Sequence, residues 1–150
     1  MTPYDAELLN EHELKNSEIA LKKLLIKLQD NNYKWFAIYP INEGRYYIVK
    51  GTENIMVLFK REVFFNFGEM FKHEGMKGVG DSINVHDLQI AIQKDVKTIY
   101  SIFPDEKMYF IPLQEFLEKS FKWKNKEGKD VRSISIHEYK RLAEKIYEND

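Results

Sequence analysis

A charged cluster directly follows an apolar run near the middle of the chain. Residues 55–59, IMVLF, lead without a break into Lys60, Arg61 and Glu62. A lysine at the end of a buried strand, beside carboxylates, suits phosphodiester hydrolysis. The carboxylates would hold Mg²⁺, which polarises the phosphate and lowers the pKa of its bound water, and the lysine would orient that water or stabilise the pentacoordinate charge. The alternative is an ordinary solvated strand end, and the pattern alone favours that alternative.

Four carboxylates are candidates for this chemistry. Glu62 adjoins Lys60, while Glu43 and Glu53 lie at the ends of predicted hairpin strands. Glu18 borders the apolar stripe of a predicted first helix. Burying Glu18 unpaired would cost several kcal/mol, so it would meet a lysine, an arginine or a metal. The alternative is a carboxylate at the edge of the stripe that bends out to water.

A basic segment near the C-terminal end alternates cations with aromatic residues. It spans 119–132, KSFKWKNKEGKDVR. On a hairpin, Phe121 and Trp123 would point to one face and the intervening lysines to the other. Such a segment offers charge for phosphates and rings for packing or base stacking, although two acidic residues dilute the charge and a solvated hairpin tip explains it equally well. The candidate nucleic-acid contacts are Lys122, Lys124, Lys126 and Arg132.

Composition restricts the remaining classes of function. The net charge is −1, so any nucleic-acid contact depends on a local patch. The absence of cysteine excludes disulfides, thiolate metal sites and cysteine nucleophiles. The first residues, MTPYDAELLN, lack a secretory signal pattern, and no stretch reaches the ~18 apolar residues of a membrane span. We therefore expect a cytoplasmic protein that does not enter a membrane.

The elements that position these residues are expected to form one α/β domain over 1–150. Leucines at helical spacing predict a first helix over 5–30, a sheet core follows over 34–111, and a hairpin and helix occupy 112–150. The predicted strands of the core are 34–41, 45–50, 54–60, 98–103 and 107–111. We expect a mixed central sheet with helices on both faces.

The other segments are predicted from their glycine, proline and helix-capping residues. Residues 63–80 are aromatic and then rich in glycine, which predicts a short helical turn followed by a loop. The next segment, 81–96, has a helical apolar face. A helix starts at Pro112, the basic segment forms a hairpin, and a capping box, Ser135-x-x-Glu138, opens the last helix.

The element order and several stretches resemble the restriction-endonuclease-like, or PD-(D/E)XK, nuclease superfamily. The order α-βββ-α-β is that of its core. Similarity to small nuclease-like proteins of archaea and their viruses lies in VLFKREVFFNFG, GVGDSIN, VKTIYSIFPDEKMYFIPLQEFLEKS and NKEGKDVRSISIHEYKRL. The resemblance covers residues 5–137. It implies a restriction-endonuclease-like fold and action on DNA, in the host cytoplasm where the source is a virus.

The resemblance also assigns residues. It implies a Mg²⁺- or Mn²⁺-dependent deoxyribonuclease. In this enzyme Lys60 would match the lysine of the family motif, and Glu18 would match the acidic residue on the first helix. The family pattern has an acidic residue two positions before the lysine, whereas position 58 here is leucine. Either Glu62 or Glu53 substitutes for that acid, or the site is degenerate and the protein only binds.

Three hypotheses about function follow. In the first, the protein cleaves DNA, with Glu18, Glu53 and Glu62 as metal ligands and with Lys60, Glu62 and Glu18 in catalysis. In the second, a non-catalytic module keeps the fold and binds nucleic acid or a protein through the aromatic segment 64–71. In the third, that segment and the C-terminal helix form a homodimer.

Overall fold

The computed structural model describes residues 16–41, 45–60, 79–103, 107–125 and 127–145. Six segments, among them the one over 61–78 that contains Arg61 and Glu62, therefore lie outside the described residues. In chain order the elements are α1 (Asn16–Asp30), β1 (Trp35–Ile41), β2 (Tyr46–Gly51), β3 (Asn54–Phe59), β4 (Val79–Asn84), α3 (Val85–Gln93), β5 (Val96–Ile102), β6 (Met108–Pro112), α4 (Leu113–Lys119), β7 (Phe121–Lys124), β8 (Asp130–Ser135), α5 (Ile136–Leu142) and β9 (Glu144–Lys145).

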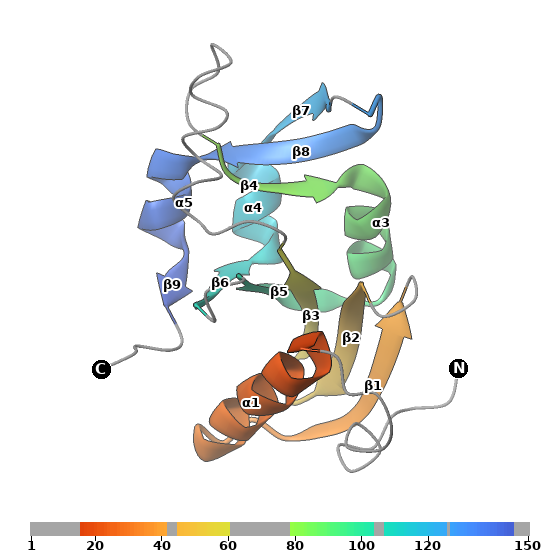
Figure 1. Cartoon of the computed structure of the whole chain (residues 1–150), viewed down its shortest axis with the longest axis vertical. Helices are drawn as coiled ribbons and strands as arrows, with labels where there is room; N and C mark the ends of the chain where they lie inside the picture. Colours follow the sequence, from red (N-terminus) through yellow and green to blue (C-terminus); the bar gives the residue numbers. More distant parts are fainter. Residues whose placement is uncertain (1–15, 42–44, 61–78, 104–106, 126, 146–150) are drawn as a thin grey trace.

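The strands form two sheets. A six-stranded mixed sheet has the order β1-β2-β3-β5-β6-β9, and a three-stranded sheet has the order β4-β8-β7 (Figure 1). The meander β1-β2-β3 and the hairpin β5-β6 are antiparallel, as the sequence predicts. Between them, β3 and β5 pair in parallel. A parallel pair needs a long crossover connection, and here the connection includes β4 and α3.

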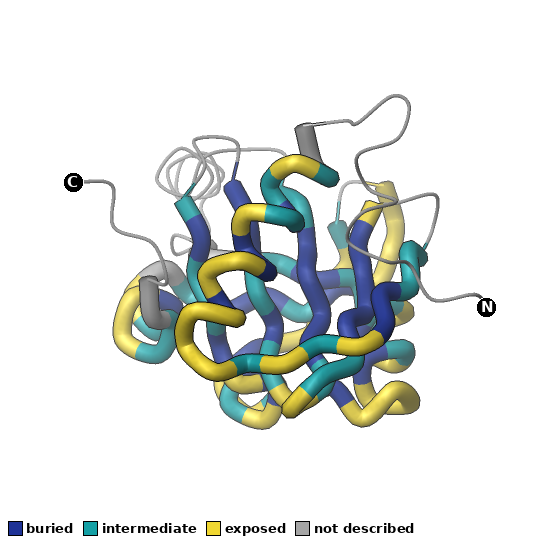
Figure 2. The backbone as a smooth tube through the Cα atoms, turned by 90° about the horizontal axis from the view of Figure 1, so that it is seen from below, coloured by how far each residue is buried: buried dark blue, intermediate teal, exposed yellow. Residues whose placement is uncertain are grey.

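The main sheet has a hydrophobic core on each face, as expected of central strands whose residues are nearly all apolar. Along β3, Ile55 and Val57 pack against the leucine stripe of α1, while Met56 and Leu58 point to the opposite core. That second core is covered by α3, α4, α5 and the three-stranded sheet (Figure 1). Buried residues concentrate in the central strands between these layers (Figure 2). The prediction of a mixed sheet with helices on both faces is confirmed.

The prediction was wrong at β4. A loop was expected up to residue 80 and a helix from residue 81, but residues 79–84 form a strand and α3 begins only at Val85. The reason is tertiary: β4 pairs antiparallel with β8, with Ser82 opposite Ser133 and Ile83 opposite Arg132, and Ile83 is buried. Pairing with a distant strand therefore overrides the local helical pattern.

The C-terminal helix is shorter than predicted. The last helix was expected to fill the end of the predicted 112–150 segment, but α5 ends at Leu142, and the chain then extends so that β9 pairs with β6. Edge pairing with β6 satisfies backbone groups that a further helical turn would satisfy within the helix. Among the described residues, no helix is both long enough and apolar enough to cross a membrane.

The predicted cap at the start of α5 is confirmed. The Ser135 hydroxyl accepts a hydrogen bond of 3.2 Å from the backbone N–H of Glu138. The Glu138 carboxylate accepts a hydrogen bond from Arg141 at 2.7 Å, which lowers the pKa of Glu138. Of the two capping-box side chains, Ser135 therefore caps the helix backbone, whereas the Glu138 side chain bonds to Arg141.

Removing this cap tests its contribution to stability. The Ser135→Ala variant is expected to lose about 1 kcal/mol of unfolding free energy, because an N–H at the helix start loses its acceptor. Urea denaturation followed by circular dichroism measures this change. Ser135→Asp is the matched control, since its carboxylate can accept the same hydrogen bond. Equal destabilisation in both variants would show that the hydroxyl acts in some other way.

Candidate functional site

Lys60 lies directly after β3 and connects the two sheets. Its backbone N–H donates to the Ile102 carbonyl at 2.8 Å, which extends the pairing with β5 by one residue. Its half-buried ammonium donates to the Ser82 carbonyl of β4 at 2.9 Å. The lysine thus points toward the three-stranded sheet, away from α1. A strand end held in this way explains why a cation follows such an apolar strand.

Position 58 belongs to the hydrophobic core. Leu58 is 7 % exposed, packs in the core beneath α3, and points to the same side of the main sheet as Lys60. Its partners across the sheet are Tyr46 on β2 and Ser101 on β5, both buried. The place where the resemblance expects a carboxylate is therefore occupied by apolar packing.

A carboxylate that sequence reasoning missed acts on Tyr46, the residue of β2 that pairs with Leu58. The hydroxyl of Tyr46 is buried, and burial is the main cause that raises its pKa far above the usual value. The Asp87 carboxylate, from the first turn of α3, raises that pKa further, although the two groups do not meet ordinary hydrogen-bond geometry. One sequence signal could have identified Asp87: it directly precedes Leu88, at the border of the apolar face of α3.

The predicted carboxylates are not gathered around Lys60 in the described part of the chain. Glu18 is half-buried on α1, which covers the opposite face of the main sheet. Glu53 is exposed directly before β3, whereas Lys60 directly follows it. Seven residues of extended chain span roughly 23 Å, so these two side chains lie at opposite ends of the strand. Glu43 and Glu62 lie outside the described residues.

The described residues do not provide the Mg²⁺ or Mn²⁺ site that the resemblance implies. Among them, no three His, Cys, Asp or Glu side chains come together in a group that could hold a metal ion. Both ions prefer several oxygen ligands at short distance, and Glu18 and Glu53 are separated as described above. No catalytic step through a metal can be derived from these side chains.

The β7-β8 hairpin presents part of the predicted cationic surface. Lys122 and Lys124 are exposed on one face of β7, and Lys124 forms an exposed ion pair with Asp130 at 3.3 Å. On the other face Phe121 is 44 % exposed, whereas the Trp123 indole donates to the buried Ser133 hydroxyl. The alternation predicted for this hairpin is confirmed. Lys126 lies outside the described residues.

Arg132 is placed differently from the lysines of the hairpin. It is half-buried, and its guanidinium donates to the Ser120 hydroxyl at 2.9 Å, the Ser120 carbonyl at 3.0 Å and the Leu117 carbonyl at 3.3 Å. These acceptors lie at the C-terminal end of α4, where backbone carbonyls lack helical partners. The arginine therefore fastens β8 to α4.

Comparisons with known proteins do not assign a function to this chain. No family model, no curated protein and no solved structure matches the chain. The restriction-endonuclease-like resemblance consequently stays a prediction, and the functional argument depends on the described side chains.

Proposed function

We propose that this protein binds nucleic acid without cleaving it, on a nuclease-like fold. The order α-βββ-α-β of the resemblance has counterparts in α1, β1-β2-β3, α3 and β5, with β4 belonging to the other sheet. This agreement supports the proposed fold family. The proposal that the protein does not cleave nucleic acid rests on one observation. Leu58 stands where the resemblance expects an acidic residue, and it is buried in the hydrophobic core.

The proposed contact surface is the β7-β8 hairpin. Lys122 and Lys124 supply exposed ammonium groups, and Phe121 supplies an exposed ring. The ion pair of Lys124 with Asp130 is solvent-exposed, so it contributes at most about 1 kcal/mol and exchanges readily for a phosphate contact. The lysines and the ring lie on opposite faces of a single ribbon, which suits a single strand that wraps its edge, because the bases of a single strand are open to stacking.

Binding measurements against salt test this proposal. Fluorescence anisotropy with single-stranded and duplex DNA is expected to show affinity that falls steeply with salt concentration. In the double variant Lys122→Ala/Lys124→Ala, the slope of log K against log salt is expected to decrease by about 1.4 for single strands. Lys97→Ala is the matched control, because Lys97 is exposed on β5 and paired with Asp95 at 3.2 Å. An unchanged slope in the double variant would overturn the proposed surface.

Metal-dependent cleavage is the second candidate, and Asp87 is the observation that favours it. This carboxylate reaches the side of the main sheet to which Lys60 points. Incubation with DNA and Mg²⁺, Mn²⁺ or EDTA decides between the candidates. Cutting that both Lys60→Ala and Asp87→Asn abolish, in folded variants, would establish this candidate and refute the non-catalytic proposal. Glu18→Ala serves as the carboxylate control from the opposite face.

A further inference from the structure

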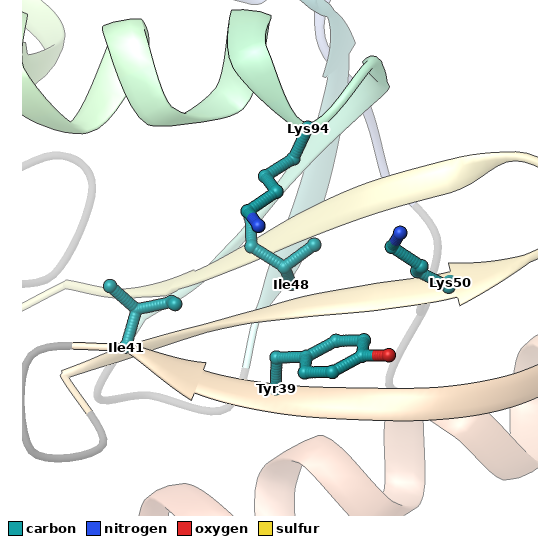
Figure 3. Close-up of a pocket in the computed structure, with 5 residues that line it drawn as sticks. All are labelled: Tyr39, Ile41, Ile48, Lys50 and Lys94. Carbon is teal, nitrogen blue, oxygen red and sulfur yellow. The ribbon is translucent and has the colours of Figure 1, made fainter. Parts of the chain in front are cut away.

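A small hollow lies on the outer strands of the main sheet, beyond the C-terminal end of α3. It encloses about 240 Å³ and is lined by Tyr39 and Ile41 of β1, Ile48 and Lys50 of β2, and Lys94 (Figure 3). The two isoleucines and the tyrosine ring supply apolar surface. Both lysines extend toward this hollow from different elements, β2 and the end of α3. The hollow is separate from the β7-β8 hairpin.

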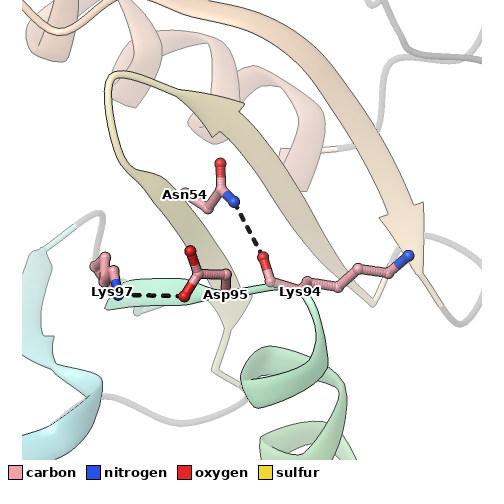
Figure 4. A network of polar contacts seen from close by, with 4 residues as sticks. All are labelled: Asn54, Lys94, Asp95 and Lys97. Carbon is pink, nitrogen blue, oxygen red and sulfur yellow. Dashed lines mark hydrogen bonds and ion pairs between the residues drawn. The ribbon is translucent and has the colours of Figure 1, made fainter.

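The two ammonium groups have no acidic partner among the described residues. Lys50 lies over the Tyr39 ring, with its nitrogen 5.8 Å from the ring centroid, and forms no ion pair with a described carboxylate. The nearest acidic neighbour of Lys94 in sequence is Asp95, whose carboxylate pairs instead with Lys97 at 3.2 Å (Figure 4). The described residues therefore give the hollow two cations above an apolar floor.

The backbone holds Lys94 in a defined place. Its N–H donates to the Ile90 carbonyl at 2.9 Å, and its carbonyl accepts from the Asn54 side chain at 3.0 Å (Figure 4). Asp95 has a φ of 55°, which turns the chain sharply from the end of α3 into β5. These hydrogen bonds fix the backbone of Lys94 at the rim of the hollow. Only the Lys94 side chain must therefore become ordered when a ligand binds.

We propose that this hollow binds an aromatic phosphate monoester of the size of one nucleotide. Two cations match the charge of a phosphate monoester, about −1.5 to −2 at neutral pH. The apolar floor suits a planar ring, and the volume is slightly below the ~300 Å³ lower end of typical ligand pockets, which limits the ligand to a single unit. This inference goes beyond the nucleic-acid proposal, because it uses other residues and applies equally to a free nucleotide and to the phosphorylated end of a strand.

Calorimetry on the full chain tests the proposal with adenosine 5′-monophosphate as the probe. Binding is expected to be weakened at least roughly tenfold by Lys50→Gln and by Lys94→Gln, since each removes a charge-assisted contact. Lys97→Gln is the matched control and should leave the affinity unchanged. All three lysines have exposed or half-exposed side chains, so their variants are expected to fold. Absence of binding, or equal affinity in all variants, would overturn the proposal.

Further probes separate the parts of the ligand. Adenosine and inorganic phosphate should each bind more weakly than the monophosphate, and equal binding by either one would refute the combined site. Competition by a 5′-phosphorylated oligonucleotide, but not by its 5′-hydroxyl form, would identify a strand end as the source of the ligand. Competition by neither form would identify a free nucleotide. The Lys122→Ala/Lys124→Ala variant should retain monophosphate binding, so failure of the hairpin proposal and failure of this one are distinguishable.

Discussion

The Leu58→Glu variant, which recreates an acidic residue two positions before Lys60, is expected to lose at least about 3 kcal/mol of unfolding free energy at neutral pH. Leu58 is 7 % exposed and packs among apolar residues of the core beneath α3. The substitution removes this packing and places a carboxylate in the core. The Lys60 ammonium, which already donates to the Ser82 carbonyl, would offset only part of that cost.

The pH dependence isolates the contribution of the charge. A buried glutamate has a raised pKa in the folded state, so it is neutral in both states below its unfolded pKa, about 4.3. As pH rises through the folded pKa, the unfolded state ionises preferentially and stability is lost. The stability difference between Leu58→Glu and the neutral isostere Leu58→Gln is therefore expected to grow from pH 4 to pH 8.

Urea denaturation monitored by tryptophan fluorescence measures these differences. Leu58→Met is the control for packing, and its cost is expected to stay below about 1.5 kcal/mol because it nearly conserves volume. A Leu58→Glu protein as stable as Leu58→Met at pH 8 would contradict the assignment of this position to the core. It would also show that the fold accepts the acidic residue, which would remove the main support for a non-catalytic protein.

The sequence predicts five strands of the main sheet, β1, β2, β3, β5 and β6, because their signals are local, whereas β9 was not predicted. Only a few residues separate the runs over β1, β2 and β3, and β5 and β6 follow one another closely in the chain and pair antiparallel. Such hairpins depend on neighbours in the chain. By contrast, β4 becomes a strand through its pairing with β8, about 50 residues later, and nothing in VGDSIN itself specifies that pairing.

The candidate site was harder to predict, because sequence spacing gives the face of a residue within one element but not its neighbours in space. Glu53 and Lys60 are close in sequence, but a strand separates them. Glu18 has the stripe-edge position expected of it, but its helix covers the other face. The approach of Asp87 to Tyr46 depends on how α3 packs, which periodicity does not encode.

Arg132 shows the same limit, because the sequence predicts it as part of a charged surface. Its register opposite Lys122 confirms that both residues point to one face of the three-stranded sheet. That face meets α4 at Arg132, and the guanidinium bonds to Ser120 and Leu117 there. A cation in a basic stretch thus becomes a connection between a strand and a helix end.

The Arg132→Ala variant is expected to lose about 2–3 kcal/mol of unfolding free energy, since a half-buried charged group that makes three hydrogen bonds is removed. The Ser120 and Leu117 carbonyls at the end of α4 would lose their donor. Arg132→Lys is expected to recover less than half of the loss, because one ammonium cannot reproduce the planar fork of the guanidinium. Chemical denaturation followed by circular dichroism measures both variants.

The same variant separates a structural role from a nucleic-acid contact. At a temperature where Arg132→Ala is fully folded, its affinity for DNA and its salt slope are expected to equal those of the wild type, whereas Lys122→Ala reduces the slope by about 0.7 for single strands. Loss of slope in Arg132→Ala without loss of stability would reverse this assignment and restore Arg132 to the binding surface. Loss of stability alone would mean that this basic segment serves two purposes, with the lysines of β7 open to a ligand and the arginine of β8 committed to holding α4.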